Sequence, residues 1–187
     1  MSRFYDLTDD MRAPGRWHLR HPLDEHGLKI DPWQFTEGRR LGPQGTIRFP
    51  VKPDGVELEF TQGAFSIPVV HSRVVQLFER MGIQDVQFIP AHVNGHSGPW
   101  FILNSLRVIH CIDEPRCREV QHFMPEDGQP EKVGQYRVVS GMRINPTKAG
   151  DAHIFRPWGW TMALIVSEDL KQALEREPIT GTRFTEV

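Results

Sequence analysis

The feature that most constrains the fold is the C-terminal stretch at 161–184, TMALIVSEDLKQALEREPITGTRF. The short apolar run TMALIV predicts a buried strand. Ser167 predicts the start of a helix, because its hydroxyl can accept from free N–H groups of the first turn, and the acids that follow suit the positive end of the helix dipole. Pro178 ends the helix, and Gly181 lets the chain turn back into a last strand. This strand–helix–strand element contains no residue that indicates catalysis.

A second helix is predicted over 72–82. Val74, Phe78 and Met81 recur on one face, Ser72 is the predicted N-cap and Gly82 ends the helix. Strands are predicted elsewhere in RFYDL near the start, TIRFPV (46–51), VELEF (56–60), DVQFIPAHV (85–93), WFILNSLRVIHCID (100–113), REVQHF (118–123), QYRVVSGMRI (135–144) and HIFRP (153–157).

The order of these elements predicts the fold class. Strands dominate, two helices are interspersed and there is no regular βαβ alternation, which favours α+β with a mostly antiparallel sheet and two main amphipathic helices. The turn sequence KPDG between TIRFPV and VELEF predicts a hairpin. Residues 1–45 are rich in Pro, Gly, His and Trp and predict a long irregular N-terminal segment, with a helical turn near 32–35. With 187 residues, the chain is expected to form a single domain over 1–187.

Composition excludes several classes of function. A net charge of -2 gives no electrostatic footprint for a nucleic-acid backbone. The N-terminus, MSRFYDLTDD, lacks the apolar core of a signal peptide, and no apolar stretch approaches the ~20 residues that cross a bilayer. Cys111 and Cys117 are expected to be free thiols. We therefore expect a cytoplasmic protein that binds neither membrane nor nucleic acid.

The histidines raise the question of a metal or catalytic site. His92 and His96 are separated by Asn94-Gly95, a turn signal, so an exposed hairpin tip is favoured over a metal site. The pentapeptide GHSGP at 95–99 departs from a nucleophile elbow because it ends in proline and precedes a strand. Asp151 and His153 would share a face, but no nucleophile accompanies them. We predict no catalytic residue, no metal and no cofactor.

The tryptophans are the best candidates for binding. Large aromatic side chains in loops, accompanied by arginines, are typical of protein interfaces. A place in the core is the other interpretation, and it is the favoured one for any single tryptophan. The candidate partner contacts are Trp17, Trp33, Arg156, Trp158 and Trp160, with Arg16 and Arg20 nearby in the sequence.

A family resemblance rests on the order of several strings. They are VVHSRVVQLFERMGIQDVQFIPAHV, WFILNSLRVIHCID, HIFRP, ALIVSEDLKQALE and ITGTRF. Their order and spacing resemble the immunity proteins of bacterial polymorphic toxin systems, in the family first catalogued from myxobacterial proteins of unknown function. The resemblance covers roughly residues 45 to 187, and its most specific pieces are Ile154-Phe155-Arg156, Ile165-Val166-Ser167-Glu168 and Thr180-Gly181-Thr182-Arg183-Phe184.

The resemblance implies a cytoplasmic protein that binds and neutralises a cognate toxin encoded by a neighbouring gene, without chemistry of its own. Two alternatives stay open: a small His-dependent or metal-dependent hydrolase, and a binding or oligomerisation module that has no toxin. Homodimers are common among soluble proteins, and dimerisation is expected on that ground alone.

Overall fold

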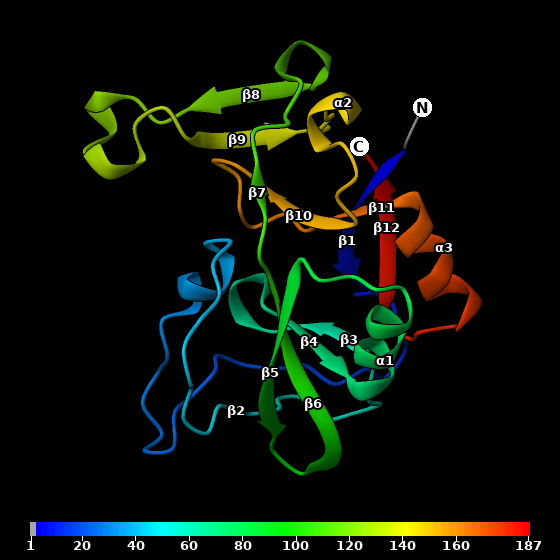
Figure 1. The fold of residues 1–187 in the computed structure, drawn as a ribbon. Coiled ribbons are helices and arrows are strands. Elements are labelled where there is room, and N and C mark those ends of the chain that lie inside the picture. Colours follow the sequence, from blue (N-terminus) through cyan, green and yellow to red (C-terminus); the bar gives the residue numbers. More distant parts are fainter. Residues whose placement is uncertain (1–2) are drawn as a thin grey trace.

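Two five-stranded sheets form the framework of the molecule in the computed structural model, which describes residues 3–187 (Figure 1). The first sheet has the strand order β12-β1-β11-β10-β7. Its strands are β1 (Phe4–Asp9), β7 (Val108–Ile109), β10 (Ile154–Pro157), β11 (Ile165–Ser167) and β12 (Thr182–Glu186).

The second sheet has the strand order β2-β5-β6-β4-β3. Its strands are β2 (Arg48–Phe49), β3 (Phe60–Gln62), β4 (Pro68–His71), β5 (Val86–Val93) and β6 (His96–Ser105). A separate hairpin is made of β8 (Glu119–His122) and β9 (Tyr136–Ser140), and it lies with α2 (Pro146–Ala149) at one end of the molecule (Figure 1).

The pairings correct two details of the sequence-based prediction. The α+β class is confirmed, but the strands form separate sheets, and each of the two five-stranded sheets contains one parallel pair: β7 pairs in parallel with β10, and β2 with β5. The hairpin predicted from TIRFPV and VELEF is wrong. Val51 instead bridges Leu19, and Val56 bridges Arg16, so the N-terminal segment supplies the partners expected from the neighbouring strand.

The helices α1 (Ser72–Arg80) and α3 (Glu168–Arg176) are the two predicted amphipathic helices. Ser167 caps α3 as expected, because its Oγ accepts from the Leu170 N–H at 3.3 Å. The predicted cap of α1 is wrong: the ring of His71 accepts from the Arg73 N–H at 3.3 Å, and Ser72 is already helical. No helix in the described part of the chain is long and apolar enough to cross a membrane.

Both sheets and both helices share one apolar cluster. Tyr5 from the first sheet and Phe60 from the second pack there with Phe78 of α1 and Leu170 of α3. Gly181 closes this junction, because its φ is +89° and an added Cβ would lie 2.2 Å from the Phe60 carbonyl oxygen. Only glycine allows this approach, which brings the C-terminal strand to the second sheet.

The N-terminal segment covers the other face of the second sheet. Between β1 and β2 the chain has isolated bridges and one short 3-10 helix, η1 (Pro32–Thr36), in place of longer strands. The segment nevertheless supplies core side chains: Trp17, Leu19, Phe35 and Leu41 are all buried against that sheet. The Trp17 indole N–H donates to the Thr61 hydroxyl at 2.8 Å. This irregular segment is therefore part of the folded core.

A buried ion pair joins the two sheets and the N-terminal segment. Asp9 is the last residue of β1, and its Oδ2 accepts from Arg16 Nη2 at 2.6 Å and from the Gln62 N–H of β3 at 3.2 Å. The two charged side chains are 6% and 4% exposed. Arg16 also donates to the carbonyl oxygens of Asp10 at 3.0 Å and Trp17 at 3.1 Å. Three parts of the chain thus meet at one carboxylate.

Removing one member of this pair is expected to destabilise the fold strongly. Arg16→Ala leaves the Asp9 charge buried without its partner, which costs about 3 kcal/mol of unfolding free energy. The double variant Asp9→Ala, Arg16→Ala should lose less than the sum of the two single variants. Urea denaturation measures these values, with the exposed Arg12→Ala as the matched control. A loss for Arg16→Ala no greater than for Arg12→Ala would contradict the role of the pair.

Candidate functional site

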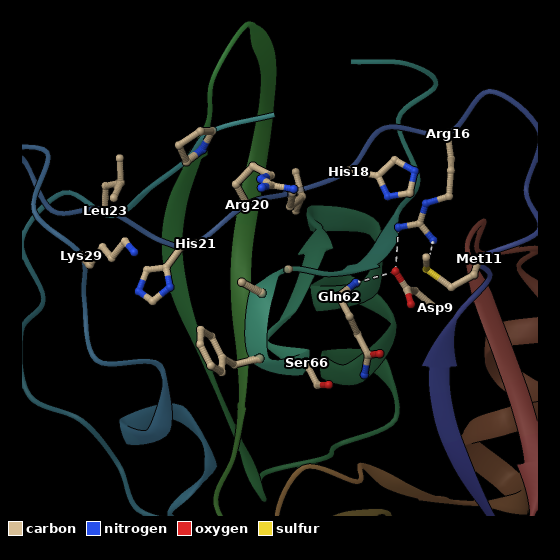
Figure 2. Close-up of a pocket in the computed structure, with 15 residues that line it drawn as sticks. Asp9, Met11, Arg16, His18, Arg20, His21, Leu23, Lys29, Gln62 and Ser66 are labelled. Carbon is tan, nitrogen blue, oxygen red and sulfur yellow. Dashed lines mark hydrogen bonds and ion pairs between the residues drawn. The ribbon is translucent and has the colours of Figure 1, made fainter. Parts of the chain in front are cut away.

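A groove of about 760 Å³ opens between two segments that are distant in sequence. Residues from the N-terminal segment, at 16–29, line one side, and the turn at 62–66 between β3 and β4 lines the other (Figure 2). The isolated bridges between Leu23 and both Lys29 and Arg48 hold the first side in place. The Asp9–Arg16 pair lies at one end of the groove, so the junction of the sheets also positions this surface.

The groove carries a net positive charge. Arg20 and Lys29 are exposed, and neither forms an ion pair within residues 3–187. His18 and His21 also line the groove. Asp9 is the single acidic residue among the lining residues, and Arg16 neutralises it. A negatively charged partner therefore meets two uncompensated cations.

An exposed aromatic side chain stands at the groove on a strained turn. Phe65 is 49% exposed, and its ring packs edge-on against His21 at 5.4 Å and Trp33 at 5.5 Å between ring centroids. Phe65 and Ser66 have φ values of 61° and 57°, in the left-handed region that non-glycine residues rarely adopt. Such strain persists where the surroundings enforce it, and it gathers at functional sites.

The five predicted partner contacts do not form one surface. Trp17 and Arg156 are fully buried, so they belong to the core. Trp33 is 49% exposed beside Phe65, whereas Trp158 is 38% exposed and stacks on His110 at 4.2 Å between centroids. Trp160 is half-buried against a third apolar cluster that contains Phe155. Of the five residues, Trp33 alone lies next to the groove.

Sequence reasoning missed Lys29 and Phe65. Phe65 lies about 40 positions after the basic residues, and nothing local in the sequence indicates that the two segments meet. The turn that carries it follows Gly63, whose N–H donates to the Ile67 carbonyl oxygen at 2.9 Å. A phenylalanine placed between this glycine and Ser66, in a turn, was the available signal for an exposed aromatic side chain.

Arg156 is a buried cation of the first sheet. Its Nη1 donates to the carbonyl oxygens of Thr161 at 2.6 Å and Ala163 at 3.4 Å. Burial lowers the pKa of Arg156 to about 10, against the opposing attraction of Asp6. Burial likewise raises the pKa of Asp6 to about 6, although the Leu164 backbone and Arg156 favour its charged form. Arg156 therefore contributes to the fold and is not available to a partner.

The histidines do not form a metal site within residues 3–187, where no group of three or more potential ligands converges. The predicted tip at Asn94-Gly95 is confirmed, since it joins β5 to β6. His96 there contacts Glu57 at 2.6 Å and Asp54 at 2.7 Å through its two ring nitrogens. Burial alone would lower the pKa of His96, but these two carboxylates raise it overall. His96 thus fastens the loop at 54–57 to the hairpin.

Two other polar clusters contain a hydroxyl group. His153 Nδ1 lies 3.3 Å from Ser167 Oγ, which is the cap of α3. Asp151, which the sequence analysis paired with His153, is exposed and contacts Arg107 at 3.6 Å. Elsewhere, Tyr136 donates to Glu114 at 2.8 Å, and burial together with that carboxylate raises the Tyr136 pKa. Burial also raises the pKa of Cys111 to about 12. The phenol and the thiol therefore stay protonated near neutral pH.

The left-handed backbone at Phe65 should make glycine more stabilising than alanine at this position, the reverse of the usual order. Because a left-handed side chain costs about 1 kcal/mol or more, Phe65→Gly should be more stable than Phe65→Ala by about 1 kcal/mol. Ala64→Gly, one position earlier and without a positive φ, should lower stability instead. Thermal denaturation of the three variants provides the comparison. Equal stability of the two Phe65 variants would show that the turn is unstrained.

Asp6 predicts a specific dependence of stability on pH. Its folded-state pKa of about 6 lies above the value of ~3.9 in an unfolded chain, so the folded state binds more protons between these values. This contribution therefore falls as pH rises from 4 to 6, by about 2 kcal/mol. Subtracting the stability of Asp6→Asn from that of the unchanged chain, at each pH, isolates it. A difference that is flat across this range would exclude the raised pKa.

One comparison with known proteins identifies the family. The family model described as Immunity protein family (Imm11) matches residues 3–187. The match includes the loop-rich N-terminal segment, for which the sequence alone gave little resemblance. No curated protein matches the chain. Since the family model spans essentially the whole sequence, the chain belongs to the Imm11 immunity protein family.

Proposed function

We propose that this chain is a stoichiometric inhibitor that binds and neutralises a cognate toxin in the cytoplasm. The observation that carries this proposal is the family match over residues 3–187. The toxin is expected to be the product of a neighbouring gene. We also propose that residues 1–187 act as one domain, because both sheets contribute to one apolar cluster.

An inhibitor that acts by binding needs a surface that is complementary to its partner. Stable complexes of this kind bury about 1,600 Å² in total, and a few aromatic or arginine side chains supply most of the binding energy. The exposed Trp33, Phe65 and Trp158 are side chains of that type. The presence of these side chains supports binding to a protein partner. Members of an immunity family are generally not enzymes, which also favours inhibition by binding.

The direct test is growth. Cells expressing the toxin domain of the neighbouring gene are grown with and without this chain. Restored growth, together with a one-to-one complex of the purified proteins, supports the proposal. A toxic domain from which the chain gives no protection would overturn the assignment for that pair.

The hydrolase alternative rests on the contact between Ser167 and His153, and one substitution separates it from binding. Ser167→Asn keeps a side chain that can cap α3 but removes the hydroxyl. We expect full protection of growth by Ser167→Asn and a stability close to that of the unchanged chain. Ser167→Ala should lose about 1 kcal/mol through the missing cap and still protect. Loss of protection in both variants, with the folded protein still present, would favour the hydrolase.

A further inference from the structure

We propose that the basic groove is the toxin-binding surface, and that it takes an acidic segment of the toxin carrying one aromatic or long aliphatic side chain. This inference rests on the proposed function and assigns it a place. The groove is the surface lined by the N-terminal segment at 16–29 and by the turn at 62–66.

The positive charge of the groove indicates the chemistry of the toxin segment that binds there. Arg20 and Lys29 are exposed and unpaired within residues 3–187, on a chain whose net charge is -2. A local positive groove on a weakly acidic protein attracts carboxylates and steers them during encounter. Two cations are too few to hold a nucleic-acid backbone, which rewards long arrays of Lys and Arg.

The aromatic side chains at the groove indicate that the toxin segment carries an apolar side chain next to its acidic ones. Phe65 projects from the turn at φ 61°, where the backbone alone would favour glycine, and Trp33 packs against it. A fold that holds a large aromatic side chain half-exposed on a strained turn presents a rigid contact whose conformation is set before binding. Such preorganised aromatic surfaces lose little entropy when a partner binds. The complementary group on the toxin is an apolar side chain that covers the Phe65 ring.

The groove is also firmly supported. The Asp9–Arg16 pair lies at one end, and the buried Trp17 and Leu19 anchor the same segment in the core. The groove volume of about 760 Å³ falls within the range of ~300–1,000 Å³ typical of sites that enclose a small ligand. It can therefore take a few side chains of one segment, with the rest of the interface formed around its rim.

The surface around Trp158 is the competing location. Its pocket of about 260 Å³ is lined by His110, Glu114, His122, Tyr136 and Lys148 among others. The Glu114 carboxylate there accepts from Tyr136 and contacts His122 at 3.2 Å, so this pocket holds a negative charge beside its one lysine, Lys148. The basic groove keeps its two cations free, and for that reason it is the better match for an acidic partner.

Charge reversal tests the proposal. The probe is the catalytically inactive toxin domain of the neighbouring gene, and its affinity for the full chain is measured by titration calorimetry. Arg20→Glu with Lys29→Glu should weaken binding about 100-fold, and should reduce the slope of the association rate against salt. Arg20→Gln with Lys29→Gln should lie between. Both residues are exposed, and circular dichroism checks that each variant is folded.

The matched control makes the same change in charge elsewhere. Lys132→Glu with Lys148→Glu alters two exposed lysines near the β8–β9 hairpin and α2. This pair should bind within about threefold of the unchanged chain. Equal losses from both pairs, or a loss from the control alone, would overturn the groove as the binding surface.

A substitution of Phe65 tests the proposed apolar contact with the toxin. Phe65→Gly removes the anchor and relaxes the turn, so it should weaken binding about tenfold or more while thermal stability stays at least that of Phe65→Ala. Binding unaffected by Phe65→Gly overturns the anchor. If the unchanged chain neither binds nor protects, the proposed function itself fails. If it binds and all the groove variants bind equally well, only the present inference fails.

Discussion

The buried Asp9–Arg16 ion pair is the contact on which the arrangement of the molecule depends. A carboxylate at the end of β1 can be buried there because Arg16 and the Gln62 N–H satisfy it. Each of the three partners comes from a different part of the chain: the first sheet, the N-terminal segment and the second sheet. Their relative placement is therefore set by one carboxylate. A displacement of any of the three parts would remove a partner from a buried charge.

The groove inherits its rigidity from this junction. Its basic side is continuous in sequence with Arg16 and with the buried Trp17, so the residues proposed to meet a toxin alternate with residues that form the core. An irregular segment would ordinarily lose entropy when it binds a partner. Here folding has already ordered it, because apolar side chains from the same segment cover one face of the second sheet.

Local signals in the sequence predicted the elements that local physics determines. The cap at Ser167, the stop at Pro178 and the turn at Asn94-Gly95 all act within a few residues, and the structure confirms the elements they predict. The hairpin between TIRFPV and VELEF failed because Leu19 and Arg16, far away in sequence, took the bridging positions. The same limit hid the groove, whose two sides meet only through tertiary packing.

Composition was a weaker guide to individual side chains. Trp17 and Trp33 lie in the same loop-rich segment, yet one is fully buried and the other is half-exposed. Arg156 belongs to the string that best carries the family resemblance, and its burial shows that this string reports the fold. The fold class and the family could be read from the sequence, whereas the choice of contact residues required the packing of the N-terminal segment.

Hydrogen exchange of the chain alone and in complex with the inactive toxin domain tests whether the toxin binds in the groove, because it maps the contact without any substitution. Binding in the groove should slow exchange in peptides covering 16–29 and 62–66. Slowed exchange confined to the β8–β9 hairpin and residues 158–160, with the groove peptides unchanged, would contradict it.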